Sequence, residues 1–252
     1  MRGHSLLFAR LTKKPMKYSD QLIEEYKELW LTATSNELTR EWCQGTLHLS
    51  KLYVYLTQDL KYFGDGFRLL GKTISLCRRR QSLVSLGKHV GMLSNSENTY
   101  FVDCINDLTE QLLRDGMYNA EELEEISGLT LPAVERYLLF MRSMVESSTI
   151  TYAEMITVMF VMEQVYLDWS NNGLRSKPDN LHWWFNEWID IHSGENFESW
   201  CQFLKDEVDR CIQELKDANR DDLVARVEEI FRETLELEVE FFKSCYDITD
   251  DE

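Results

Sequence analysis

Apolar residues recur every three to four positions along most of this chain, the spacing that places them on one face of an α-helix. Leu52, Leu56, Leu60 and Phe63 show this spacing. Strict alternation of apolar and polar residues, the pattern of a half-buried strand, does not compete seriously anywhere. The pattern predicts helices at Tyr18–Thr34, Glu37–Cys43, Ser50–Cys77, Gln81–Arg114 (bent near Ser94–Asn98), Glu121–Ile126, Pro132–Ser147, Tyr152–Asn172, His182–His192, Glu195–Ala218 and Asp221–Tyr246.

Three glycines fall inside the long helix predicted at Ser50–Cys77: Gly64, Gly66 and Gly71. Glycine costs about 1 kcal/mol relative to alanine in an exposed helix, so we expect these positions to pack closely against neighbours. No internal repeat, low-complexity linker or change of composition divides the chain. The sequence therefore predicts a single all-α domain.

Charge distinguishes the two ends of the chain from its body. Residues 1–17 contain basic residues and no acid, whereas residues 247–252 are acidic. We expect a basic leader at 1–17, the helical domain at 18–246 and an acidic tail at 247–252. A weak organellar presequence is the alternative interpretation of the leader.

The net charge narrows the range of partners. Of the 252 residues, 27 are Lys or Arg and 44 are Asp or Glu, giving a formal charge of −17. Such a charge repels phosphate backbones and anionic lipids, so nucleic-acid and membrane-surface binding are not expected. No apolar run reaches the roughly 18 residues of a membrane span. The six cysteines form no closely spaced pair and follow no secretory signal, which predicts free thiols and a cytoplasmic location.

Common metal and nucleotide motifs are missing. None of the five histidines follows a glutamate at the spacing of di-iron bundles, and His-Glu-x-x-His does not occur. Gly64-Asp65-Gly66 begins like a dinucleotide-binding loop, but Leu69 replaces the third glycine. Neither a P-loop nor Gly-x-Ser-x-Gly is present. We therefore predict no metal and no cofactor.

Three carboxylates interrupt apolar helix segments: Asp59, Glu163 and Glu238. A buried carboxylate needs a partner or a raised pKa, and a raised pKa is what makes a general acid or base. Ordinary surface positions remain the alternative for Asp59 and Glu238. Tyr62 and Tyr166 follow Asp59 and Glu163 by three residues, on the same helix faces, so the two pairs predict a polar pocket with aromatic walls.

Four segments of the chain are similar to the TenA (thiaminase II) family. Gln58–Tyr62 resembles the family's Gln-Asp-x-x-Tyr helix, and Glu238–Phe242 resembles its C-terminal Glu-x-x-Phe-Trp motif. Met162 stands where many members have a cysteine, and Glu163 follows it, which is similar to the fungal-type glutamate class. Glu187–Asp190 matches a Trp-Ile segment of the family.

The resemblance implies a haem-oxygenase-like helical fold without haem, assembled as a homo-oligomer, either a dimer or a tetramer. It implies that Asp59, Tyr62 and Tyr166 bind an aminopyrimidine, that Glu238 is the catalytic acid and base, and that Glu163 holds or activates water. The implied reaction is metal-free hydrolysis of 4-amino-5-aminomethyl-2-methylpyrimidine or its N-formyl form, in thiamin-pyrimidine salvage.

Some residues depart from the family pattern. His192 stands where other members have a pocket tyrosine, Val134 occupies another aromatic position, and Phe242 replaces a tryptophan. A degenerate member that binds a pyrimidine, or acts as a structural or regulatory partner without catalysis, is therefore the alternative. A haem-oxygenase relative would need a proximal histidine near the first helix, where only His4 precedes His48.

Overall fold

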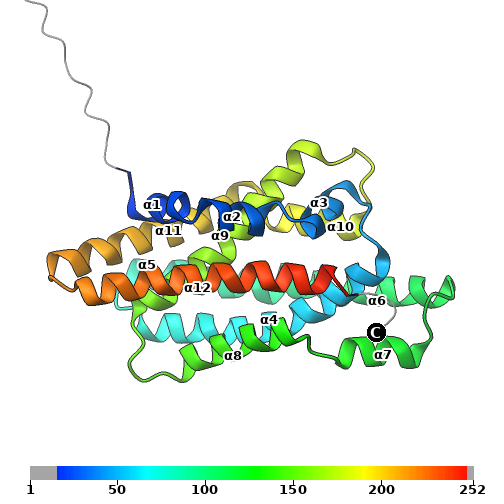
Figure 1. Cartoon of the computed structure of the whole chain (residues 1–252), viewed down its shortest axis with the longest axis horizontal. Coiled ribbons are helices and arrows are strands. Elements are labelled where there is room, and N and C mark those ends of the chain that lie inside the picture. Colours follow the sequence, from blue (N-terminus) through cyan, green and yellow to red (C-terminus); the bar gives the residue numbers. More distant parts are fainter. Residues whose placement is uncertain (1–15, 249–252) are drawn as a thin grey trace, which may run out of the picture.

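The computed structural model describes residues 16–248, and every regular element in this range is helical (Figure 1). The predicted all-α, single-domain fold is confirmed. Most of the expected basic leader, His4, and the last four residues of the expected acidic tail lie outside the described residues. The elements are α1 (Tyr18–Glu25), α2 (Lys27–Thr34), α3 (Glu37–Gln44), α4 (Leu49–Leu76), α5 (Arg80–Met92), the π-helix η1 (Leu93–Glu97), α6 (Asn98–Arg114), α7 (Ala120–Gly128), α8 (Pro132–Glu146), α9 (Tyr152–Ser176), α10 (Trp183–Ile191), α11 (Gly194–Asp217) and α12 (Asp221–Tyr246).

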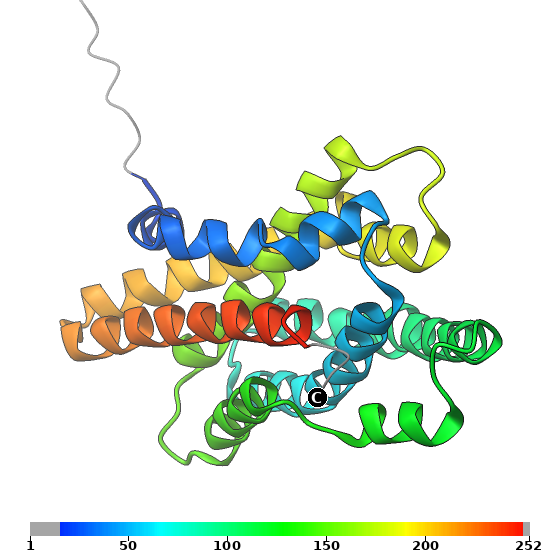
Figure 2. The same ribbon diagram turned by 45° about the vertical axis from the view of Figure 1, so that its right-hand side comes forward.

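Helix α9 is the central element and packs against α2, α3, α4, α10, α11 and α12 (Figure 2). Thr151 and Glu154 form a capping box at its start, each bonding to the backbone amide of the other. Near its end, a Cβ atom added at Gly173 would lie 2.5 Å from Cys43 Sγ, so this glycine allows α3 to approach closely. The middle of α9 is buried on nearly all sides, which explains its run of apolar residues.

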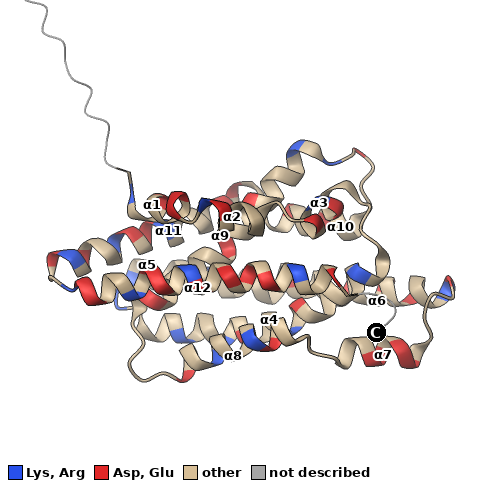
Figure 3. Cartoon of the chain, viewed as in Figure 1, with Lys and Arg blue, Asp and Glu red and all other residues tan. Residues whose placement is uncertain are grey.

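Helices α4, α8 and α12 pack against one another, with α8 and α12 toward the viewer in Figure 1. Asp65 of α4 is buried and accepts hydrogen bonds from Arg68 at 2.5 Å and from Arg142 of α8 at 2.7 Å. Acidic and basic residues both follow the outside of α12 (Figure 3). None of the helices in the described range is long and apolar enough to cross a membrane.

Two of the predicted helices are interrupted. The helix expected at Tyr18–Thr34 breaks at Tyr26, whose φ and ψ are −99° and 26°. The break lets α1 pack on α11 while α2 packs on α9 and α12. The helix expected at Gln81–Arg114 is interrupted where a bend is expected, near Ser94–Asn98, by the π-helical turn η1.

The prediction of close packing at the three glycines of α4 is wrong. A Cβ atom added at Gly64, Gly66 or Gly71 would meet no heavy atom within 4 Å. Gly64 and Gly71 are exposed, and Gly66 borders a cavity. The six cysteines are buried free thiols, as predicted.

Candidate active site

A cavity of about 60 Å³ opens between α4, η1, α9 and the end of α10. This is several times the roughly 10–15 Å³ that a single water molecule needs. Its walls combine apolar side chains with carboxyl, phenol and imidazole groups. The lining residues are Asp59, Tyr62, Phe63, Gly66, Leu69, Leu70, Leu93, Glu97, Met159, Met162, Glu163, Tyr166 and His192.

Asp59 is held at this cavity by the residue before it. Gln58 accepts a hydrogen bond from the backbone amide of Leu131 at 3.0 Å and donates one to the carbonyl of Leu129 at 2.8 Å, which fixes this turn of α4 against the start of α8. Asp59 is only 3% exposed, which excludes the surface alternative. Burial raises its pKa to about 7, and nearby Glu97 adds to the rise, although a hydrogen bond from Tyr55 opposes it.

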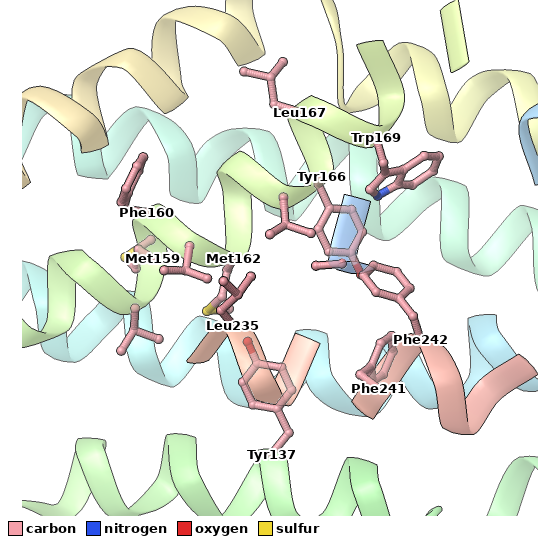
Figure 4. Close-up of a cluster of buried hydrophobic side chains, with 14 of the residues drawn as sticks. Tyr137, Met159, Phe160, Met162, Tyr166, Leu167, Trp169, Leu235, Phe241 and Phe242 are labelled. Carbon is pink, nitrogen blue, oxygen red and sulfur yellow. The ribbon is translucent and has the colours of Figure 1, made fainter. Parts of the chain in front are cut away.

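Glu238 of α12 is 1% exposed and therefore does not face solvent. Tyr137 of α8 donates a hydrogen bond to its Oε1 at 2.6 Å, and the hydroxyl of Tyr62 lies 3.5 Å from the same oxygen. In Figure 4, Tyr137 projects from its helix toward Met162 and Leu235. Burial raises the pKa of Glu238 to about 8, against the hydrogen bond from Tyr137 that lowers it. This carboxyl is therefore mostly protonated at neutral pH.

Glu163 lines the cavity from α9 and has a fixed partner. Its Oε1 lies 3.0 Å from Nε2 of His89, a buried residue of α5. The imidazole of His89 stacks on Trp200, with ring centroids 3.8 Å apart and planes inclined by 15°. The sulfur atom of Cys201 lies 3.5 Å from the backbone carbonyl oxygen of Glu163, so this thiol contacts the backbone of Glu163 rather than its carboxylate. His89 thus orients the glutamate.

His192 and Glu97 form a second imidazole–carboxylate pair at the cavity. Nε2 of His192 lies 3.5 Å from Oε1 of Glu97, and Nδ1 donates to the carbonyl of Trp188 at 2.9 Å. Burial lowers the pKa of His192, but the hydrogen bond and charge of Glu97 outweigh it, so the pKa is raised overall. The imidazole therefore retains its proton to higher pH than usual.

Aromatic rings surround Tyr166, which forms one wall of the cavity. Its hydroxyl lies 3.0 Å from the hydroxyl of Tyr55. The centroid of its ring lies 5.0 Å from that of His192 and 5.8 Å from that of Phe242. Figure 4 shows Tyr166 beside Phe242. Burial raises the pKa of Tyr166 well above its usual range, so its hydroxyl remains a hydrogen-bond donor at physiological pH.

The structure brings the five predicted site residues together. Four of them line the cavity: Asp59, Tyr62, Glu163 and Tyr166. Glu238 lies beside the cavity, with its Oε1 3.5 Å from the hydroxyl of Tyr62. Among residues 16–248, no group of three His, Cys, Asp or Glu side chains is arranged to hold a metal ion.

Four polar residues of the site were not predicted: Tyr55, His89, Glu97 and Tyr137. Val134 does not line the cavity, whereas Tyr137, three residues later on α8, donates a hydrogen bond to Glu238. No local sequence pattern distinguishes Tyr137 from an ordinary core aromatic.

Comparison with known proteins identifies the family of this chain. The sequence profile of the TENA/THI-4/PQQC family matches residues 23–248. The chain belongs to that family. A comparison with curated protein sequences finds no match.

Solved structures share the TENA/THI-4/PQQC fold with this chain. A TenA homologue from Pyrococcus furiosus is 14% identical, with a TM-score of 0.71 over 90% of this chain and 99% of its own. A TenA family transcription regulator from Silicibacter sp. TM1040 is 15% identical, with a TM-score of 0.70 over 93% and 99%. A protein from Sulfolobus solfataricus, proposed to be a TenA-like thiaminase, is 14% identical, with a TM-score of 0.66 over 91% and 96%. At these identities the similarity establishes the fold.

Proposed function

We propose that this protein is a thiamin-pyrimidine salvage hydrolase. Its substrate would be 4-amino-5-aminomethyl-2-methylpyrimidine or the N-formyl form, cleaved by general acid and base catalysis. The observation that carries the proposal is the convergence of Asp59, Glu163 and Tyr166 on one cavity, with Glu238 beside it, in a chain of the TENA/THI-4/PQQC family. With Glu163 directly after Met162, we assign the chain to the glutamate class of TenA proteins.

Asp59 is suited to recognise the aminopyrimidine ring. A 4-aminopyrimidine presents a ring nitrogen that accepts a hydrogen bond next to an amino group that donates one. A protonated carboxyl group offers one donor and one acceptor, and the pKa of about 7 leaves Asp59 partly protonated at neutral pH. The carboxyl O–H of Asp59 can therefore donate to the ring nitrogen while its carbonyl oxygen accepts from the amino group. The rings of Tyr62 and Tyr166 would flank the flat heterocycle.

Glu238 and Glu163 divide the proton transfers. Glu238, protonated at neutral pH because its pKa is about 8, can supply a proton to the nitrogen that leaves the methylene carbon. Once ionised, it can accept a proton from the attacking water. Glu163, oriented by His89 at 3.0 Å, would hold that water. The carbon–nitrogen bond breaks, a carbon–oxygen bond forms, and the products are the hydroxymethylpyrimidine and ammonia, or formamide from the N-formyl form.

The first test combines binding and turnover. Calorimetry with the aminomethylpyrimidine and its hydroxymethyl product should show binding to the wild type that is lost in Asp59→Ala. The control is Asp103→Ala, which removes an exposed aspartate of α6 and should bind normally. Ammonia release should be lost in Glu238→Gln. Full turnover by Glu238→Gln, or unchanged binding by Asp59→Ala, would contradict the proposal.

The same assays address the non-catalytic alternative. The TenA family transcription regulator from Silicibacter sp. TM1040 shares the fold, and this observation favours a binding role as the second candidate. Binding that depends on Asp59 without any turnover would favour a pyrimidine-binding protein. The homo-oligomeric state and the cytoplasmic location remain predictions, and the former is measurable by sedimentation of the purified chain.

A further inference from the structure

Glu97 presents a buried carboxylate oxygen that has no partner. The residue is the last of the π-helical turn η1 and is only 8% exposed. It lines the cavity, and its Oε1 lies 3.5 Å from Nε2 of His192. Its Oε2 is buried and makes no hydrogen bond with any residue of the described chain. Leaving such a group unpaired costs roughly 1–3 kcal/mol, more when it is charged, so the oxygen points to a missing ligand.

The surroundings of His192 keep this arrangement in place. Its Nδ1 is committed to the carbonyl of Trp188 at 2.9 Å, so its Nε2 is the nitrogen that faces Glu97. Trp188 and Phe197 contact its ring, with centroids 4.2 and 5.1 Å away. Because His192 occupies Oε1, the second oxygen of Glu97 is the one left for a ligand.

The charges of the cavity indicate what kind of ligand this oxygen would accept. Three carboxyl groups line the wall, those of Asp59, Glu97 and Glu163, and His89 already occupies one oxygen of Glu163. Within residues 16–248, no Lys or Arg side chain lines the cavity. A phosphate group would therefore enter an acidic site without a permanent positive partner, whereas a cation would find an unpaired carboxylate oxygen.

We propose that Glu97 binds the protonated aminomethyl nitrogen of the substrate and makes this site selective for cationic, unphosphorylated pyrimidines. The inference rests on the proposed function and names the substrate class within it. A primary alkylamine is protonated at neutral pH, and its three N–H donors suit the unpaired Oε2 of Glu97. Asp59, which would hold the ring, lines the same cavity. Bound as an ammonium, the nitrogen already carries the proton with which it leaves as ammonia, so the acid role of Glu238 applies to the neutral N-formyl form.

The test compares two ligands that differ in charge. Calorimetry at neutral pH would use the aminomethylpyrimidine, which is cationic, and the hydroxymethylpyrimidine, which is neutral and of similar size. Wild type should bind the aminomethyl compound more tightly than the hydroxymethyl compound. Glu97→Gln keeps the shape of the side chain and removes its charge. It should weaken the binding of the aminomethyl compound by about tenfold to a hundredfold, the contribution of a charged hydrogen bond. The affinity for the hydroxymethyl compound should change by less than about twofold. Glu110→Gln, at an exposed position on α6, is the matched control and should change neither.

The outcomes separate this inference from the proposed function. Equal loss for both ligands in Glu97→Gln, or no loss for either, would overturn the inference and leave the hydrolase proposal standing. Failure of the wild type to bind either ligand would overturn both. If Glu97→Gln does not fold, the wild type alone decides, because equal affinity for the two ligands contradicts a cation site.

Discussion

Replacing Glu238 with glutamine should reduce the loss of stability that this protein suffers as the pH rises. Burial raises the pKa of Glu238 from 4.5 to about 8, so the folded state binds a proton that the unfolded state releases. Between these two pH values the folded state is therefore progressively destabilised as pH increases. A glutamine carries no charge at any pH and avoids this loss.

The magnitude follows from the difference between the two pKa values. At about 1.36 kcal/mol per pKa unit, the change from 4.5 to about 8 corresponds to about 5 kcal/mol in full, of which about 4 kcal/mol falls between pH 5 and pH 9. The buried amide of glutamine has its own cost, because its NH₂ group needs an acceptor. That cost is the same at both pH values, so it cancels when the two are compared.

Urea denaturation of wild type and Glu238→Gln at pH 5 and pH 9 measures this effect. We expect the stability of the variant relative to wild type to be about 4 kcal/mol more favourable at pH 9 than at pH 5. Glu236→Gln removes a carboxylate from the half-exposed side of the same helix and controls for the change in net charge. A relative stability of Glu238→Gln that is the same at both pH values would show that Glu238 is not held as a buried acid, and would refute the reasoning.

Three further predictions concern the surroundings of the site. Tyr137→Phe removes the 2.6 Å hydrogen bond to Glu238, which should raise the pKa of that carboxyl further. The alkaline limb of the pH–rate profile should then move upward by about one pH unit, and an unmoved limb would contradict this. Gly173→Ala places a methyl group 2.5 Å from Cys43 Sγ and should destabilise the fold by about 1–3 kcal/mol. The double variant that adds Cys43→Ala should recover this stability in thermal melts, and no recovery would mean that the clash lies elsewhere. Thr151→Ala removes the capping box of α9 and should cost about 1 kcal/mol in urea denaturation, whereas an unchanged midpoint would show that tertiary packing alone holds the start of this helix.

The helical fold and the core of the site could be predicted from the sequence because both depend on local patterns. Asp59 and Glu163 stood out as carboxylates inside apolar helix segments, and both are at the cavity. Tyr137 could not be distinguished from an ordinary core aromatic, because only the packing of α8 on α12 brings it to Glu238. Glu97 lies in a polar stretch that predicted a bend, and a π-helical turn there directs it inward.

The interruption of the first predicted helix shows a second limit. The residues around Tyr26 have no proline or glycine, so the sequence there favours one continuous helix. The break is set by the need of α1 and α2 to pack on different partners, α11 for one and α9 with α12 for the other. Tertiary contacts of this kind are absent from a single sequence.

Gly66 makes the size of the cavity adjustable through a single side chain. It borders the cavity, and a methyl group added there would touch no other atom within 4 Å. Alanine is favoured over glycine inside a helix by about 1 kcal/mol, so Gly66→Ala should strengthen α4 while it takes space from the ligand. A substitution at this one position should therefore raise thermal stability while it narrows the range of ligands. A series of larger residues at position 66 would change stepwise which heterocycles the protein admits.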